Sequence, residues 1–349
     1  MARKNKKGGG KRQRAQQRAQ YDELDKYPVL PPHAFARIVR DKQTLNIIYQ
    51  IIEPPMTKKE QEQRDEILDI FIRSLTANIE EIDANPEAYI RTAMDKVIKA
   101  YGMKINKKSK SKIFYYLRRD LIGYGEMDVL MNDINVEDIS LDGTNVPIFA
   151  YHRKFESVET TCVWKTDEEL ESYVIKLAQR CGKHISVADP LLDATLMDGS
   201  RIVMKLGREV STRGSAFCIR RFKDDPFSPA DIVAFRTMSS LMVAYLWIAF
   251  QNEVPMLFVG GTASGKTTTL NAMCIFIPWQ MKIVSIESTR EVNIPQPNWV
   301  PGLTRQGFGG ESKDGVIGEF ELLKAALRER PEYIIVGEIR GAEAYVLFQ

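Results

Sequence analysis

Apolar side chains recur at helical spacing in the first third of the chain. Three stripes follow one another there: Ile67, Phe71 and Leu75; Ile90, Met94 and Val97; and Ile113, Leu117 and Leu121. A capping box at Thr57–Glu60 precedes the first stripe, and Asn85-Pro86 precedes the second. Because each stripe places its apolar residues on one face of a helix, the pattern predicts a helical, packing region over residues 31–122.

Shorter apolar runs separated by turn residues follow over residues 123–222. Two β-hairpins are predicted, one turning at Asp142-Gly143 and one at Asp198-Gly199. Between them, Thr166 caps an amphipathic helix that Gly182 ends. A mixture of hairpins and a helix is typical of a small α+β domain.

Beyond residue 230, apolar runs alternate with helical segments. The runs lie at 256–259, 283–286 and 333–336. This spacing predicts parallel strands joined by crossover helices, which makes residues 231–349 an α/β domain. Residues 223–230 are polar and contain two prolines, so we interpret them as the linker in front of that domain.

The beginning of the chain differs from the rest in charge. Residues 1–20 are basic and hold no acidic side chain, so the remainder is net acidic although the whole chain carries +3. We expect a disordered basic tail over residues 1–30 that is mainly solubilising, with weak contact to anionic lipid or RNA as the alternative role. The acidic remainder argues against a specific nucleic-acid surface. The longest apolar run, Leu241–Phe250, is too short to cross a membrane.

One segment matches the phosphate-loop pattern G-x-x-x-x-G-K-T at every fixed position. The candidate binding residues are Gly260, Gly261, Thr262, Ala263, Ser264, Gly265, Lys266, Thr267 and Thr268. An apolar run precedes this segment and a predicted helix over 268–276 follows it, which is the context that a phosphate loop requires. The backbone N–H groups would surround a β-phosphate, Lys266 would reach the β- and γ-phosphates, and the Thr267 hydroxyl would ligate Mg²⁺.

Two of the predicted strands end in carboxylates. Glu338 follows the run at 333–336, and Glu287 and Glu291 follow the run at 283–286. Since parallel strands present their carboxyl ends at one edge of a sheet, Glu338 could hold Mg²⁺ through water or orient an attacking water. Glu287 and Glu291 could divide the same tasks, although taken alone they also fit a solvated loop.

Arginines cluster near the end of the predicted α+β domain, at Arg201, Arg208, Arg213, Arg220 and Arg221. An arginine supplied across a domain or subunit boundary can neutralise charge that develops on a γ-phosphate. Most of this set are expected to be ordinary surface residues, and two or three are candidates for that role.

Taken together, these motifs resemble those of the type II/type IV secretion ATPase superfamily, and most closely its archaeal branch that powers pilus and archaellum assembly. The resemblance covers residues 110–349. Besides the phosphate loop, it rests on Leu121–Glu126, Val136–Gly143, Tyr151–Phe155, Asp198–Arg201, Arg213–Ser215, Ile219–Phe222 and Arg330–Gly341.

The resemblance implies a RecA-like P-loop motor domain preceded by a small α+β domain. It implies ATP and Mg²⁺ as ligands, with Lys266 and Thr267 in the phosphate loop and Glu338 at the Walker B position. Glu287 and Glu291 match the family's acidic box, and Arg201, Arg213 and Arg220 match the arginines that approach the phosphates. It further implies a homo-hexamer that works in the cytoplasm against a polytopic membrane platform, with no specific nucleic acid.

The sequence departs from the family pattern at two places. The acidic box usually reads Glu-Asp, but Ser288 follows Glu287 here. The family's histidine box would follow Gly341, so we expect the motor domain to be incomplete at its C-terminus, with uncovered apolar helix faces and an open sheet edge. We also expect these 349 residues to bind nucleotide weakly and to hydrolyse it poorly.

Three functions remain open at this point. The preferred one is an ATP-hydrolysing motor for filament assembly or protein secretion. The alternatives are a nucleic-acid translocase of the conjugation or helicase type, and a catalytically impaired nucleotide-binding regulator, which Ser288 makes conceivable.

Overall fold

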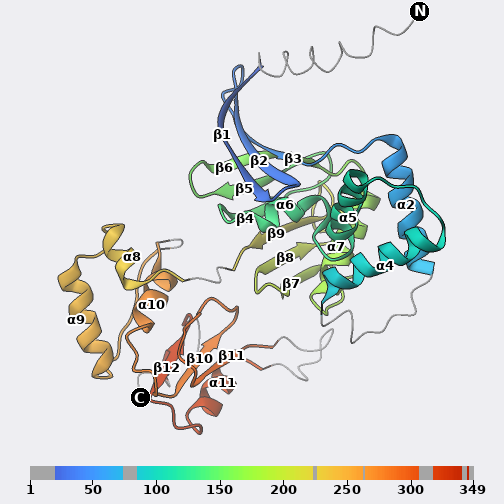
Figure 1. The fold of residues 1–349 in the computed structure, drawn as a ribbon. Helices are drawn as coiled ribbons and strands as arrows, with labels where there is room; N and C mark the ends of the chain where they lie inside the picture. Colours follow the sequence, from blue (N-terminus) through green and yellow to red (C-terminus); the bar gives the residue numbers. More distant parts are fainter. Residues whose placement is uncertain are drawn as a thin grey trace, which may run out of the picture. The chain divides into compact units, whose positions relative to one another are not determined.

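The computed structural model describes residues 20–73, 85–222, 226–261, 264–305, 317–339 and 344–345. These residues form two compact units (Figure 1). The first unit comprises Met1–Ala194 and Ile202–Arg221, and the second comprises Thr195–Arg201 and Phe222–Gln349. The predicted basic tail falls largely on residues 1–19, which lie outside the described residues.

A nine-stranded sheet forms the first unit, in the order β1-β2-β3-β6-β5-β4-β9-β8-β7. Its strands are β1 (Tyr21–Leu30), β2 (Ala34–Asp41), β3 (Ile47–Ile52), β4 (Val136–Leu141), β5 (Pro147–His152), β6 (Glu156–Val163), β7 (Leu191–Thr195), β8 (Arg201–Lys205) and β9 (Ala216–Arg220). The predicted hairpin at Asp142-Gly143 is confirmed, because β4 and β5 pair antiparallel. β7 and β8 are neighbours on either side of Asp198-Gly199, as predicted.

The described helices of the first unit are α2 (Lys58–Arg73), α4 (Pro86–Ala100), α5 (Lys107–Leu121), the short η1 (Gly125–Met127), α6 (Asp128–Asn132) and α7 (Asp167–Arg180). Three of them, α2, α4 and α7, begin where the sequence analysis places their caps. Thr57 N–H donates to Glu60 Oε2 at 2.8 Å, which completes the predicted capping box. Asn85 and Thr166 each accept from a backbone N–H of the first turn, so these predicted helix starts are confirmed.

The expectation for residues 20–57 was wrong. Residues 21–30 form strand β1 instead of a disordered tail, and residues 34–52 contribute β2 and β3 instead of helix. β1 carries charged residues and Pro28 because it lies at the edge of the sheet, where polar side chains and a missing N–H are tolerated. A prediction based on the spacing of apolar residues therefore misses this strand. The sheet therefore includes strands from both the predicted tail, residues 1–30, and the predicted helical region, residues 31–122.

The backbone connection between the N-terminal strands and the rest of the sheet is narrow. β3 and β6 pair in parallel over two residue pairs, Ile48↔Glu159 and Tyr49↔Thr160. The buried Asp133 bridges this connection: its Oδ2 accepts from Tyr27 Oη at 2.6 Å and from Tyr49 Oη at 2.7 Å. Burial and then the Asp133 carboxylate raise the pKa of Tyr49, so this phenol remains a hydrogen-bond donor.

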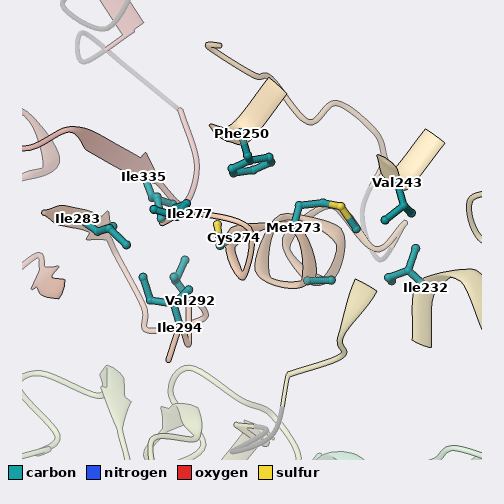
Figure 2. Packing of buried hydrophobic residues seen from close by; sticks show 11 residues of the cluster. Ile232, Val243, Phe250, Met273, Cys274, Ile277, Ile283, Val292, Ile294 and Ile335 are labelled. Carbon is teal, nitrogen blue, oxygen red and sulfur yellow. The ribbon is translucent and has the colours of Figure 1, made fainter. Parts of the chain in front are cut away.

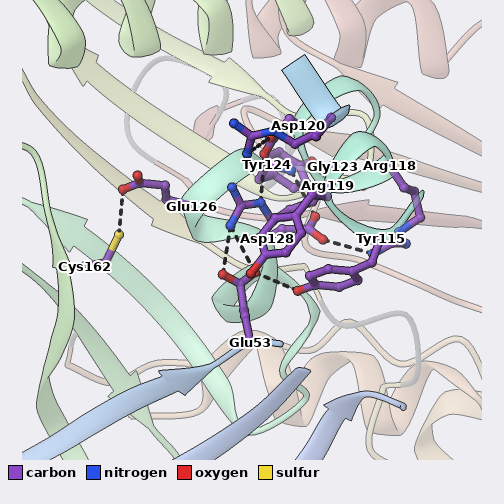
Figure 3. A network of polar contacts seen from close by, with 12 residues as sticks. Glu53, Tyr115, Arg118, Arg119, Asp120, Gly123, Tyr124, Glu126, Asp128 and Cys162 are labelled. Carbon is purple, nitrogen blue, oxygen red and sulfur yellow. Dashed lines mark hydrogen bonds and ion pairs between the residues drawn. The ribbon is translucent and has the colours of Figure 1, made fainter. Parts of the chain in front are cut away.

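A second polar network joins α5 to the end of β3 (Figure 3). Glu53 accepts from Tyr115 Oη at 2.7 Å and from Arg119 Nη1 at 2.8 Å. Asp128 accepts from Arg118 at 3.0 Å and from the backbone of Tyr124. These ion pairs are partly buried and hydrogen-bonded at several atoms, which is the setting in which such pairs contribute to a unique packing.

The glycine before η1 is required by this network. A Cβ at Gly123 would lie 2.2 Å from Asp128 Oδ1, closer than any real contact. Gly123 belongs to the segment Leu121–Glu126 that contributed to the family resemblance. Its described role is structural, since it lets the chain turn tightly beside a buried carboxylate.

A three-stranded parallel sheet forms the centre of the second unit, in the order β11-β10-β12. The elements are α8 (Pro229–Ala234), α9 (Ser240–Gln251), α10 (Lys266–Cys274), β10 (Ile283–Glu287), β11 (Trp299–Leu303), α11 (Glu319–Ala326) and β12 (Tyr333–Val336). The predicted strands at 283–286 and 333–336 are confirmed, and β11 is an additional strand. Apolar residues of both sheet and helices pack around α10 (Figure 2). The predicted α/β fold is therefore present.

The predicted strand at 256–259 does not form. Residues 254–260 belong to no helix, strand or turn, and Leu257 and Val259 are exposed. A strand requires a neighbour, and no described residue pairs with this segment. Among the described strands, β12 pairs only with β10.

α9 leaves an uncovered apolar face in the second unit. The helix has no charged residue, and Leu241, Tyr245 and Ile248 are 80%, 72% and 62% exposed. These positions lie on one side of a helix, opposite the buried Val243 and Phe250. No helix in the described part of the chain is both long enough and apolar enough to cross a membrane.

The Asp133 bridge generates a stability prediction. Asp133→Ala leaves two partly or fully buried phenols without their acceptor, so we expect the free energy of unfolding to fall by about 2–4 kcal/mol. Urea unfolding followed by circular dichroism measures this change. Asp133→Asn keeps one acceptor oxygen and should give a smaller loss.

Asp22→Ala is the matched control on the edge strand. It removes an exposed carboxylate that forms an ion pair with Lys42, which should change the free energy by no more than about 0.5 kcal/mol. An Asp133→Ala variant as stable as this control would contradict the bridging role.

Candidate active site

The phosphate loop leads directly into the first turn of α10. Gly265 caps the helix with a φ of +86°, a left-handed conformation that favours glycine. Ser264 Oγ donates to Gly261 O at 2.8 Å, and Lys266 Nζ donates to the same carbonyl at 2.7 Å. The Lys266 ammonium is thereby held over the loop at a helix N-terminus, where anions are favoured. Thr262 and Ala263 lie outside the described residues.

Helix α10 begins at Lys266, two positions before the predicted start. Gly260, Gly261, Ser264 and Thr268 are exposed, while Lys266 and Thr267 are half-buried. The loop therefore leaves its backbone accessible to a phosphate, while the side chains of Lys266 and Thr267 are half-buried beside it.

Glu287 ends β10 and is almost fully buried. Its Oε1 accepts from the backbone N–H groups of Glu291 at 2.8 Å and Val292 at 2.7 Å, whereas its buried Oε2 has no hydrogen-bond partner in the described structure. Burial raises the pKa of Glu287 to about 7, and the two backbone hydrogen bonds oppose that rise. A carboxyl group with this pKa can exchange a proton near neutral pH.

Glu291 has a different environment from Glu287. Its side chain is exposed, its N–H donates to Glu287, and its carbonyl accepts from Asn271 Nδ2 at 2.7 Å on α10. The described contacts of Glu291 are thus made by its backbone. They hold the loop after β10 against the Glu287 carboxylate and against helix α10. A chemical role for its carboxylate stays a prediction.

Glu338 follows β12 and lies across from the end of β10. Ser288 Oγ donates to Glu338 Oε1 at 2.9 Å. Gly337 stands between the two strands, where a Cβ would lie 3.1 Å from Glu287 Cγ. A side chain at position 337 would force the Glu287 side chain to shift by a few tenths of an ångström. The sequence analysis did not identify this contact, although Gly337 directly before Glu338 was a possible signal.

One cavity of about 780 Å³ is lined by residues of the phosphate loop and by the predicted carboxylate Glu338. Lys266, Thr267 and Glu338 all line it, and apolar side chains such as Phe258 and Ile335 line the remainder. Glu287 and Glu291 are not among its lining residues. Lys266, Thr267 and Glu338 therefore border the same cavity of the second unit.

The oxygen atoms at this cavity suit Mg²⁺. Thr267 offers a hydroxyl and Glu338 a carboxylate, and Mg²⁺ prefers oxygen ligands and retains several waters. No group of three or more His, Cys, Asp or Glu side chains in the described chain could hold a metal ion by itself. This donor set fits a cation that is shared with phosphate oxygens rather than enclosed by protein.

The predicted arginines lie on the nine-stranded sheet and its loops. Arg220, at the end of β9, donates to Asp138 Oδ1 at 3.2 Å and is exposed. Arg213 is exposed in the loop before β9, and Arg201 begins β8. Their predicted approach to the phosphates stays a prediction.

A stacked arginine beside the acidic loop was not predicted. The Arg290 guanidinium lies 5.6 Å from the ring centroids of both Phe222 and Trp299. Trp299 in turn donates to the buried Ser285 Oγ at 3.0 Å. These contacts fix the loop that carries Ser288 and Glu291 on its outer side.

Comparison with protein families identifies the C-terminal half of the chain. Residues 155–348 match the model of the family described as type II/IV secretion system protein. This range includes the phosphate loop, the strands β10 and β12, and the carboxylates Glu287, Glu291 and Glu338 at or beyond their ends.

Two relatives illustrate the range of similarity. The uncharacterized protein MJ0900 of the archaeon Methanocaldococcus jannaschii is 37% identical over 93% of this chain and 58% of its own length. The type IV secretion system protein VirB11 of Bartonella henselae is 29% identical over 52% of this chain and 62% of its own. The chain thus spans little more than half the length of these relatives.

Among solved structures, the ATPase DotB of Legionella pneumophila is similar at 18% identity. The match covers 63% of this chain and 60% of DotB, with a TM-score of 0.42. The two structures superpose too loosely for DotB to support the fold of this chain.

The raised pKa of Glu287 predicts a pH dependence of stability. Because the folded protein binds this proton more tightly than the unfolded chain does, the stabilisation is fully present below the ordinary pKa of 4.5 and is lost as pH rises through about 7. Glu287→Gln mimics the protonated acid at every pH. Relative to this variant, the wild-type free energy of unfolding should fall by up to about 3 kcal/mol across that window.

Urea unfolding of both proteins at a series of pH values measures the difference. Glu329→Gln, which changes a carboxylate in a surface ion pair with Lys282, serves as the control. If the difference in unfolding free energy between wild type and Glu287→Gln does not change between these pH values, Glu287 titrates normally.

Proposed function

This chain belongs to the family of type II/IV secretion system proteins, and from that premise we propose that it is an ATP-hydrolysing motor subunit. The observation that carries the proposal is the cavity that Lys266, Thr267 and Glu338 share. A phosphate-binding loop and a strand-end carboxylate facing one cavity supply what nucleotide hydrolysis needs: a cradle for the phosphates and a group that can orient water.

In the proposed reaction, water attacks the γ-phosphate of ATP. The backbone N–H groups of the loop bind the phosphates, and Lys266 leaves its Gly261 carbonyl partner to neutralise charge on the β- and γ-phosphates. Glu338 orients the attacking water or holds the metal shell through water. Mg²⁺, when bound beside Thr267, would neutralise phosphate charge.

Glu287 is proposed to act behind Glu338. It is buried beside Gly337, and its Oε1 organises the loop through the N–H groups of Glu291 and Val292. With a pKa near neutrality, it can hold or release a proton close to the site without contacting the cavity. Arg201, Arg213 and Arg220 are candidates for a supply of positive charge from another part of the assembly.

The work that such a motor performs is proposed from its relatives. VirB11 and PtlH are named as type IV secretion system proteins, and PilT as a pilus retraction motor. We therefore propose that this chain works at the cytoplasmic face of a membrane, in a homo-hexamer that acts on a polytopic platform protein. Assembly of a pilus-like or archaellum filament and export of protein are the two candidate outputs.

One observation favours a catalytically impaired regulator as the second candidate. Ser288 occupies the position where the resembled family usually has aspartate, so one acidic group is absent from the strand end. A regulator would bind ATP tightly and release no phosphate. A nucleic-acid translocase, the third candidate, would instead show ATPase activity that single-stranded DNA increases.

The first functional prediction concerns the phosphate loop. Lys266→Ala removes the ammonium group above the loop, so we expect ATP affinity to fall at least about tenfold and turnover at least about 100-fold. Fluorescent-nucleotide titration and phosphate release measure the two effects.

The control for this prediction is Lys324→Ala, an exposed lysine on α11 of the same unit. It should leave affinity and turnover unchanged. A Lys266→Ala variant with near-normal turnover would refute the assignment of the loop.

The second functional prediction separates binding from chemistry. Glu338→Gln keeps the shape of the side chain and removes its charge, so ATP affinity should stay within about threefold while turnover falls at least about 100-fold. The same two assays apply. Glu253→Gln changes another carboxylate that lines the cavity and should behave as wild type. Normal hydrolysis by Glu338→Gln would move the catalytic role to Glu291 or elsewhere.

A further inference from the structure

The ends of β10 and β12 continue in register beyond the two strands. The parallel pairing runs from Ile283↔Tyr333 to Ile286↔Val336. Gly337 N–H then donates to Ile286 O at 2.9 Å, which carries the same alignment past the last strand residues. Two positions further along, residue 288 of one segment therefore stands beside residue 338 of the other.

The contact between these two positions is directional. A carboxylate only accepts hydrogen bonds, and the Ser288 hydroxyl donates to Glu338 Oε1 at 2.9 Å. Ser288 is itself exposed, so it makes little apolar packing that would explain its presence at the strand end. An aspartate at this position would instead place two like charges side by side, and the pair would then repel unless a cation lay between them.

The loop that carries Ser288 is held on both sides. On one side the buried Glu287 packs against Gly337 and accepts from the N–H groups of Glu291 and Val292. On the other side of Ser288 in the sequence, the Arg290 guanidinium lies 5.6 Å from the ring centroids of both Phe222 and Trp299. A hydroxyl on a loop fixed in this way has a defined position, which is what a group needs in order to orient its neighbour.

We propose that Ser288 is a positioning residue that fixes the orientation of the Glu338 carboxylate toward the cavity. This inference rests on the proposed ATPase function of the same site. Ser288 supplies a neutral donor that holds Glu338 in place whether or not a cation is bound. Ser288, which stands where the resembled family usually has aspartate, would then orient Glu338 by a hydrogen bond, and its presence would not mean that the site is inactive.

Steady-state ATP hydrolysis tests the positioning role. Ser288→Ala should lower kcat about tenfold with KM for ATP within about twofold, because the carboxylate remains but loses the hydroxyl group that donates to it. Ser288→Thr keeps the hydroxyl and should restore kcat to within about threefold of wild type. Ser240→Ala, an exposed serine at the start of α9, is the control and should change neither parameter.

A second measurement needs no activity. Thermal unfolding of the nucleotide-free protein is recorded for Ser288→Ala, Glu338→Ala and the double variant. If the two side chains interact, the double variant loses less Tm than the sum of the two single losses. Additive losses overturn the contact, and a Ser288→Ala variant with wild-type kcat overturns the positioning role.

The outcomes also distinguish this inference from the function on which it rests. A wild-type protein that neither binds nor hydrolyses ATP overturns both. A wild-type protein that hydrolyses ATP, together with a Ser288→Ala variant that hydrolyses it equally well, overturns only the inference. A drop in kcat that Ser288→Thr does not restore assigns the effect to the loop fold and overturns the orienting role of the hydroxyl.

Discussion

The parallel pairing of β10 with β12 is the constraint on which the site depends. Parallel strands end at the same edge, so the residues that follow them are brought together regardless of their separation in sequence. Here that pairing places Glu287 and Ser288 beside Gly337 and Glu338, which lie 50 positions later in the chain. Glycine at 337 leaves the Glu287 side chain in place, because a Cβ there would lie 3.1 Å from Glu287 Cγ.

The chemical part of the site could be predicted from the sequence because it depends on local order. The phosphate loop is a continuous segment whose glycines, lysine and threonine have fixed spacing, and Glu338 directly follows an apolar strand. The different environments of Glu287 and Glu291 could not be predicted in this way. One is buried and the other exposed because the loop folds back onto Glu287, and that turn depends on backbone hydrogen bonds that leave no compositional signal.

Helices were predicted more accurately than strands for a related physical reason. The caps at Thr57, Asn85 and Thr166 satisfy N–H groups within their own segment, so the sequence around each contains the whole signal. A strand depends on a neighbour. Residues 256–259 are as apolar as a buried strand, yet no described residue pairs with them, whereas the charged β1 is a strand because β2 lies beside it.

The narrow connection between β3 and β6 has a consequence for how the first unit unfolds. β3 and β6 are joined over two residue pairs, and a sheet with so short a connection would ordinarily separate there. Strands β1–β3 would then unfold and refold independently of the other strands. Asp133 accepts from tyrosines on β1 and β3 while it sits just before β4, so opening that connection also exposes its carboxylate and releases both phenols. Side-chain hydrogen bonds thus supply the cooperativity that the backbone ladder lacks, and slow amide exchange should extend evenly across the connection.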